Sequence, residues 1–121
     1  MMRSINEIAA DIAFTSESKG FHITVDEVDR KLLLAVSEIC EAQDQLRDGH
    51  GLTQIYYSTN AGYGDDRMHG DSKPEGFPVE CADAIIRLLH LMHWAGIDIN
   101  EVIEQKIAYN KTRPPKHGRQ F

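Results

Sequence analysis

The sequence predicts an all-α protein in which four helices form a bundle and a Gly-rich loop or short hairpin separates the second helix from the third. Apolar residues recur at helical spacing in four segments, and proline is scarce before the C-terminus. Six of the nine glycines fall between residues 49 and 78, in the middle of this pattern. The 121 residues suit one modest core, so we expect residues 1–121 to form a single domain.

The first two helices are predicted from their apolar stripes and their ends. The stripe of residues 5–18 consists of Ile5, Ile8, Ala9, Ile12 and Ala13, and Gly20 follows as a typical helix end. Thr24 and Glu27 have the spacing of a capping box, which predicts the start of a second helix that runs to about Arg47. Its stripe consists of Leu32, Leu33, Val36, Ile39 and Cys40.

Residues 49–78 differ in character from the helices around them. Glycine recurs along the segment, and residues 53–59 are rich in Thr, Ile and Tyr, which favour extended structure. We therefore expect a short strand or hairpin followed by a loop. Thirty residues are too few for a second folded domain.

Two further helices follow this segment. Pro78 suits the first turn of a helix over residues 78–94, whose stripe includes Ala82, Ile85, Ile86, Leu89 and Met92. Asp98 or Asn100 caps a last helix over residues 98–112, and the two prolines that follow stop it.

Composition narrows the function classes. The net charge of −6 argues against general affinity for nucleic acid. Residues 106–121 carry five Lys or Arg and no acid; from charge alone, the basic tail over residues 114–121 is best explained by solubility. The sequence lacks a run of 18 apolar residues and a secretory leader pattern, so we expect a cytoplasmic protein with no membrane contact. Cys40 and Cys81 form no metal-binding spacing and are expected to be reduced thiols.

Two pairs of carboxylates are candidate ligands of a metal ion. Glu38 and Glu41 lie three residues apart on the second predicted helix, as do Glu80 and Asp83 on the third, so each pair shares one helix face. Each pair borders its apolar stripe, and antiparallel packing through the stripes would bring the four together. Clustered carboxylates repel one another unless a cation neutralises them, and oxygen ligands favour Mg²⁺ or Mn²⁺.

This spacing has a plainer explanation. One Glu-x-x-Glu pair usually marks a solvent-exposed helix face. Two pairs on helices that pack together make a metal site more probable, but the spacing alone does not establish one. A di-iron site is less favoured, because such sites use Glu-x-x-His, and neither His90 nor His93 lies three residues after a glutamate.

Four segments in order resemble the MazG-like, all-α nucleoside triphosphate pyrophosphohydrolase family. Residues 31–41, KLLLAVSEICE, look like that family's ExxE helix, and residues 80–89, ECADAIIRLL, look like its ExxD helix. Residues 96–101, GIDINE, resemble the linker into the last helix, and residues 106–114, KIAYNKTRP, are similar to its K-x-x-x-N-x-x-R segment. The end of the chain, KHGRQF, also looks like the tail of many small members. The sequence departs from the pattern at Ser37, where a second Glu is common, and in its longer gap between the paired motifs.

The resemblance implies a four-helix MazG-like bundle that cleaves a nucleoside triphosphate to the monophosphate and pyrophosphate. It implies that Mg²⁺, with Mn²⁺ as a possible substitute, is held by four residues that also carry the catalysis: Glu38, Glu41, Glu80 and Asp83. It further implies that phosphates are bound by Lys106, Asn110 and Arg113, which share a helix face, and that the base lies near Phe21 and His22. The expected assembly is a homodimer or a dimer of dimers.

Other hypotheses stay open at this point. The chain could be a non-catalytic nucleotide- or metal-binding module of the same fold, or a helical protein-interaction subunit. Phe21 could equally be a core residue, and the residues between 49 and 78 could form a lid, a base-recognition loop or a dimer contact. The preferred base and sugar, and the biological role, do not follow from the sequence.

Overall fold

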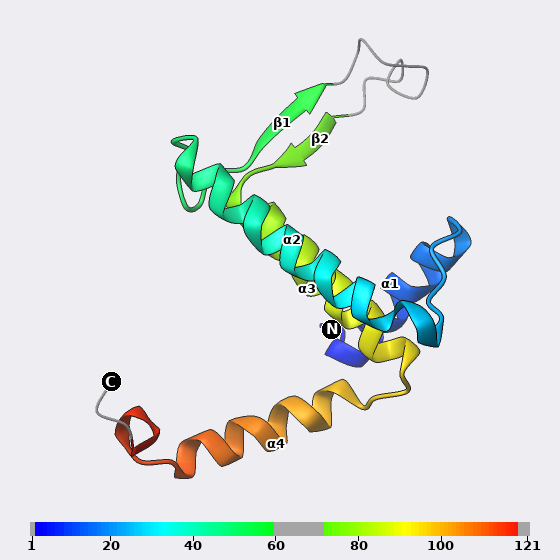
Figure 1. Ribbon diagram of the computed structural model, residues 1–121, viewed down its shortest axis with the longest axis vertical. Coiled ribbons are helices and arrows are strands. Elements are labelled where there is room, and N and C mark those ends of the chain that lie inside the picture. The colour runs from blue at the N-terminus through cyan, green and yellow to red at the C-terminus, as the bar shows by residue number, and fades with distance from the viewer. Residues whose placement is uncertain (1, 60–71, 119–121) are drawn as a thin grey trace. The chain divides into compact units, whose positions relative to one another are not determined.

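The computed structural model describes residues 2–59 and 72–118, and it is mostly helical. The helices are α1 (Ile5–Ser18), α2 (Val28–Arg47), α3 (Phe77–Trp94) and α4 (Ile99–Thr112), with short 3₁₀ turns η1 (Val25–Glu27) and η3 (Pro115–Gly118) (Figure 1). The strands β1 (Tyr56–Thr59) and β2 (Ser72–Glu75) form an antiparallel pair. The predicted all-α class is therefore confirmed in its broad form, with a short hairpin between α2 and α3.

The chain divides into two compact units. The first consists of Met1–Ile23 and Leu89–Phe121, and the second of Thr24–Leu88. Within the described residues, no helix has the length and apolar character needed to cross a membrane.

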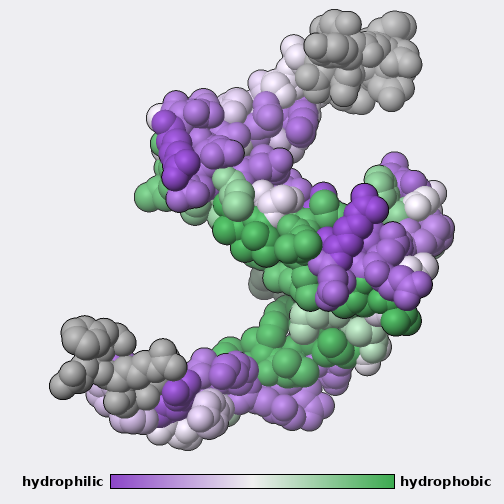
Figure 2. Space-filling view, viewed as in Figure 1, coloured by the Kyte–Doolittle hydropathy of each residue, from purple (hydrophilic) through white to green (hydrophobic). Residues whose placement is uncertain are grey.

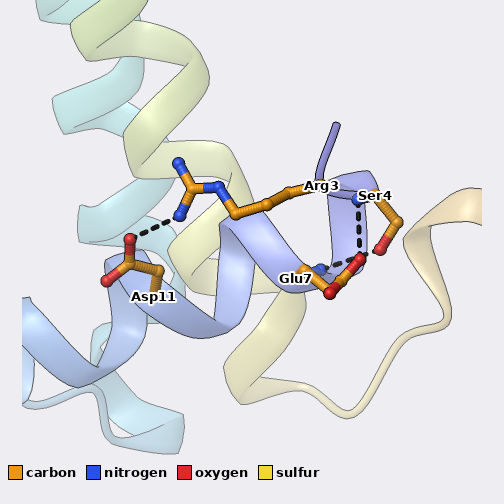
Figure 3. A network of polar contacts seen from close by, with 4 residues as sticks. All are labelled: Arg3, Ser4, Glu7 and Asp11. Atoms are coloured by element: carbon orange, nitrogen blue, oxygen red, sulfur yellow. Dashed lines mark hydrogen bonds and ion pairs between the residues drawn. The ribbon is translucent and has the colours of Figure 1, made fainter. Parts of the chain in front are cut away.

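In the first unit, hydrogen bonds fix where α1 and α4 begin. Ser4 and Glu7 form a capping box at the start of α1, in which the Ser4 hydroxyl accepts from the Glu7 N–H and the Glu7 carboxylate accepts from the Ser4 N–H. An exposed ion pair of 2.6 Å joins Arg3, which precedes α1, to Asp11 in the second turn of the helix (Figure 3).

The N-termini of α1 and α4 are joined through the Asn6 side chain. Its amide oxygen accepts from the Ile99 N–H at 2.8 Å, and its amide nitrogen donates to Asp98 at 2.9 Å. Asp98, rather than Asn100, is the N-cap of α4, because its carboxylate accepts from the Glu101 N–H. Ile99 is almost fully buried at this junction.

In the second unit, the start of α2 differs from the predicted capping box. The Glu27 N–H donates to the Thr24 backbone carbonyl and closes the 3₁₀ turn η1, so it is not available to the Thr24 hydroxyl. The hydroxyl donates instead to the Glu27 carboxylate, and α2 begins at Val28. The prediction of a capping box at Thr24 was therefore wrong.

The buried face of α2 also differs from the predicted stripe. Its buried residues are Ala35, Glu38 and Ala42, whereas Leu33 and Ile39 are 67% and 57% exposed. Small residues on the inner face leave room for side chains of the neighbouring helix, and the large apolar residues point outward. Figure 2 shows apolar side chains gathered along the middle of α2 on the visible face.

Gly76 connects the hairpin to α3 through a backbone that only glycine accommodates well. Its φ is +128°, and a Cβ there would collide with the backbone carbonyl oxygen of Gln54. The Gly76 carbonyl in turn accepts from the Glu80 N–H at 3.0 Å in the first turn of α3. Gly76 thus contacts the segment just before β1 and is hydrogen-bonded to the first turn of α3.

Candidate functional site

The second unit brings the predicted carboxylates of α2 and α3 together. One oxygen each from Glu38, Glu41 and Glu80 lies within 4.8 Å of the others. Glu38 and Glu80 are only 8% and 9% exposed, whereas Glu41 is exposed. Such a group of carboxylate oxygens suits a hard divalent cation in donor type and spacing, although exposed acidic groups also occur without one. The coarse prediction that these residues could hold a metal ion is therefore confirmed.

The pairing across the two helices shows that α2 and α3 run antiparallel at the site. Arg87 on α3 bonds to Glu38, while Glu80, two turns earlier on α3, lies within 4.8 Å of Glu41, one turn later on α2, in keeping with the opposite directions of the two helices in Figure 1. Asp83 lies between these levels on α3 and is half-buried. It does not belong to the compact group of three, but it lines the same pocket.

The pocket has a volume of about 380 Å³, within the range of small-ligand sites. Six acidic residues line it: Glu38, Glu41, Asp44, Glu75, Glu80 and Asp83. The other two lining residues are Gln45 and Lys73.

Arg87 provides a counter-charge for Glu38, one of the two buried carboxylates of the group. Its Nε donates to Glu38 Oε1 at 3.0 Å, and its Nη2 lies 3.0 Å from the same oxygen. Burial alone would raise the pKa of Glu38, but hydrogen bonds from Glu41 and Arg87 outweigh burial and leave this pKa lowered. Glu38 is consequently favoured as a carboxylate, whereas the pKa values of its neighbours are raised.

The other three carboxyl groups have raised pKa values. The pKa of Glu80 is raised to about 7, first by burial and then by the charges of Glu41 and Asp83. The pKa of Glu41 is raised mainly by its hydrogen bond to Glu38, and that of Asp83 mainly by burial, against the lowering effect of Arg87 and Lys73. In the absence of a cation, Glu80 is therefore the carboxyl group of this cluster whose pKa lies near neutral pH, as burial among like charges favours the protonated form.

The hairpin forms one wall of this pocket, a role that the sequence did not indicate. Tyr56 on β1 donates its hydroxyl to Gln45 of α2 at 2.9 Å, and the His50 ring stacks on the Tyr56 ring at a centroid distance of 4.5 Å. Lys73 and Glu75 on β2 both line the pocket. The only signal in the sequence was the extended character of residues 53–59, which does not say where the strand lies. Residues 60–71, where the sequence predicts a loop, lie outside the described residues.

The predicted phosphate-binding residues lie in the first unit, on and just after α4. Lys106 and Asn110 are exposed on α4, and Arg113 is its C-cap. The Lys106 ammonium and the Arg113 guanidinium approach the Tyr109 ring, at 5.1 and 5.5 Å from its centroid, so α4 does gather two cations. Their contact with a phosphate stays a prediction.

The predicted base-binding pair also lies in the first unit. Phe21 and His22 are exposed in the segment between α1 and η1, and 63% of Phe21 is accessible. The alternative that Phe21 is a core residue was therefore wrong. Its accessible ring leaves the stacking hypothesis open.

No family model, curated protein or solved structure matches this chain in comparisons with known proteins.

Proposed function

We propose that this chain is a Mg²⁺-dependent nucleoside triphosphate pyrophosphohydrolase of the MazG-like kind. One observation carries the proposal: the carboxylates of the ExxE and ExxD segments, which are 38 residues apart in the sequence, meet in one pocket between α2 and α3. The order of the sequence motifs supplies the reaction class, and the pocket supplies a place for the metal ion and the polyphosphate.

The donor set fits Mg²⁺, with Mn²⁺ as a substitute. Glu38, Glu41 and Glu80 would hold the ion, with Asp83 beside them in the same pocket. A bound Mg²⁺ supplies charge neutralisation at the phosphate oxygens and lowers the pKa of a bound water. A carboxylate of this group that is free of the metal accepts the proton of the attacking water. Arg87 keeps Glu38 ionised and oriented.

Substrate binding by the first unit is part of the same proposal. Lys106, Asn110 and Arg113 bind the phosphates, and Phe21 and His22 contact the base. Support comes from the two cations that gather around Tyr109 and from the accessible Phe21 ring.

We further propose that the chain assembles into a homodimer or a dimer of dimers. Seven large apolar residues of the second unit are each 39–67% exposed: Leu32, Leu33, Val36, Ile39, Ile85, Ile86 and Leu88. At roughly 30 Å² per aliphatic carbon, they present on the order of 400 Å² of apolar surface. A standard interface covers about 800 Å² per partner, a little over half of it apolar. A monomer mass that is independent of concentration in analytical ultracentrifugation would contradict this assembly.

The activity is tested with the eight common ribo- and deoxyribonucleoside triphosphates in the presence of Mg²⁺, with products separated by anion exchange. Glu41→Gln is the test variant, because Glu41 is exposed and its replacement is expected to leave the fold intact. Glu104→Gln on the exposed face of α4 is the matched control. Monophosphate and pyrophosphate formed by wild type and Glu104→Gln, but not by Glu41→Gln or in EDTA, would support the proposal.

A protein that binds a non-hydrolysable triphosphate in calorimetry without cleaving any nucleotide would instead be a binding module. If Glu41→Gln and Asp83→Asn change neither Mg²⁺ binding nor nucleotide binding, the protein would be neither a hydrolase nor a nucleotide-binding module. A role as a protein-interaction subunit would then be favoured.

A further inference from the structure

The hairpin is joined to α2 by one hydrogen bond through Tyr56, and its two strands are held together at their base. The Tyr56 hydroxyl bonds to Gln45 at 2.9 Å, and the Tyr56 ring stacks on His50. At the other strand, Gly76 packs so closely on the Gln54 carbonyl that no side chain fits between them. Lys73 and Glu75 on β2 line the carboxylate pocket, so the described strands form part of its wall.

Strand geometry decides which side chains this wall presents. Alternate residues point to the same face of a strand, and cross-strand partners share a face. Tyr56 and Ser58 of β1 are half-buried while Tyr57 is exposed, so the inner face carries Tyr56, Ser58 and their partners Glu75 and Lys73. Both partners line the carboxylate pocket, which confirms the assignment of the face independently.

Lys73 is the cation of this pocket that is available to a ligand. Six acidic residues line the pocket, and the nearby Arg87 is already bonded to Glu38. Within residues 2–59 and 72–118, Lys73 forms no direct ion pair, although its ammonium is near enough to Asp83 to lower the pKa of that carboxyl group. An ammonium on a flexible stem, placed beside carboxylates without being bonded to one, is suited to an incoming anion.

A polyphosphate needs such a group at this place. A nucleoside triphosphate is highly anionic, and an acidic pocket repels it unless positive charge is supplied. One Mg²⁺ offsets only part of the charge of three carboxylates and a polyphosphate, so a further cation on the wall strengthens binding.

We propose that Lys73 binds the phosphate chain of the substrate at the carboxylate pocket and that the hairpin serves as a phosphate-binding wall. The inference rests on the proposed function, because the anion enters together with the metal. It assigns a binding role to a residue of β2, outside the paired motifs.

Calorimetric titration of the full-length protein with inorganic tripolyphosphate at saturating Mg²⁺ tests this directly. Lys73→Ala should weaken tripolyphosphate binding about tenfold, the usual effect of losing one charge-assisted hydrogen bond. Lys73→Arg should bind within about threefold of wild type, because the positive charge is kept. Lys19→Ala, an exposed lysine at the end of α1, is the matched control and should bind as wild type. Lys73→Ala should also raise the KM for the preferred triphosphate by a similar factor while changing kcat less than about threefold.

The outcomes separate this inference from the proposed function. Unchanged tripolyphosphate binding by Lys73→Ala, or equal losses in Lys73→Ala and Lys73→Arg, would overturn the role of Lys73. Wild-type protein that binds no tripolyphosphate in the presence of Mg²⁺ would overturn it as well. Tripolyphosphate binding that depends on Lys73, together with no turnover of any nucleotide, would overturn the proposed hydrolase and leave the phosphate-binding wall in place.

Discussion

Replacement of Glu80 by glutamine should stabilise the metal-free protein at alkaline pH. Glu80 is almost fully buried beside Glu38 and Glu41, and its pKa is raised from 4.5 to about 7 by burial first and by the charges of Glu41 and Asp83 second. The ionised form is therefore the form that the folded state accommodates poorly. Glutamine keeps the size and hydrogen-bonding capacity of the side chain and removes the charge.

The sign and size of the effect follow from this pKa. Between pH 4.5 and about 7, the folded protein keeps a proton on Glu80 that the unfolded chain has lost. The contribution of Glu80 to the free energy of unfolding therefore falls as the pH rises through this window and stays low above it. At about 1.4 kcal/mol per pH unit, the ionised Glu80 costs the folded state on the order of 3 kcal/mol. For a chain of this length, that corresponds to a melting temperature on the order of 10 °C higher for Glu80→Gln at pH 8.

The assay is thermal and urea denaturation in EDTA at pH 5, 6, 7 and 8, followed by circular dichroism. The gain in stability of Glu80→Gln over wild type should be small at pH 5 and largest at pH 8. Glu104→Gln, at an exposed position on α4, should show no such trend. Saturating Mg²⁺ should stabilise wild type at pH 8 and have a smaller effect on Glu80→Gln. A gain that is equal at pH 5 and pH 8, or a net loss of stability at pH 8, would refute the reasoning from crowded carboxylates.

Three further outcomes are expected from single substitutions. Asp83→Asn should lower the rate of Mg²⁺-dependent triphosphate hydrolysis at least a hundredfold while the helical circular dichroism signal is unchanged, since Asp83 lines the pocket without holding the fold together. Gly76→Ala should destabilise the protein by more than about 1 kcal/mol in urea denaturation, because the added Cβ meets the Gln54 carbonyl at a positive φ. Arg87→Met should raise the pKa of Glu38 and shift the pH midpoint of Mg²⁺ binding, measured by calorimetry between pH 5.5 and 8, to a higher value.

The elements that the sequence predicted well are those with local causes. Asp98 caps α4, Gly96 with its positive φ ends α3, and Pro78 lies in the first turn of α3, because each of these residues determines the backbone within one turn of itself. The carboxylates were also predictable, because two pairs at three-residue spacing converge once their helices run antiparallel. Thr24 shows the limit of such signals. The Glu27 N–H can donate either to the Thr24 hydroxyl, as in a capping box, or to the Thr24 carbonyl, as in a 3₁₀ turn. In the structure it donates to the carbonyl.

The face by which α2 packs was not predictable from hydrophobicity alone. A stripe of large apolar residues usually faces the core, yet Ala35 and Ala42 are buried here, while Val36 and Ile39 are exposed. Glu38 lies on the same face of α2 as these two alanines, and there it reaches Arg87 and Glu80 of α3. The carboxylate cluster and the outward apolar face are thus two consequences of one choice of helix face.

The hairpin residues were missed for a different reason. Lys73 has no partner at a diagnostic spacing in the sequence, and its position depends on the contact of Gly76 with Gln54 and of Tyr56 with Gln45. These contacts join residues through space, so only a three-dimensional arrangement reveals that a strand far from the ExxE segment forms part of its pocket.

The Glu80 prediction also bears on why the site should need a cation. A helical pair with Ala35 and Ala42 on its inner face could be closed more favourably by apolar side chains than by Glu38 and Glu80, because burial of like charges opposes folding. Suppose that Glu80→Gln is more stable than wild type without metal but no longer binds Mg²⁺. The lower free energy of unfolding of wild type is then caused by the Glu80 carboxylate, and Mg²⁺ binding to that carboxylate restores it. Binding of Mg²⁺ near pH 7 should then release protons, since the cation replaces the proton on Glu80. Proton release measured by calorimetry in buffers of different ionisation enthalpy would therefore link the stability cost directly to metal binding.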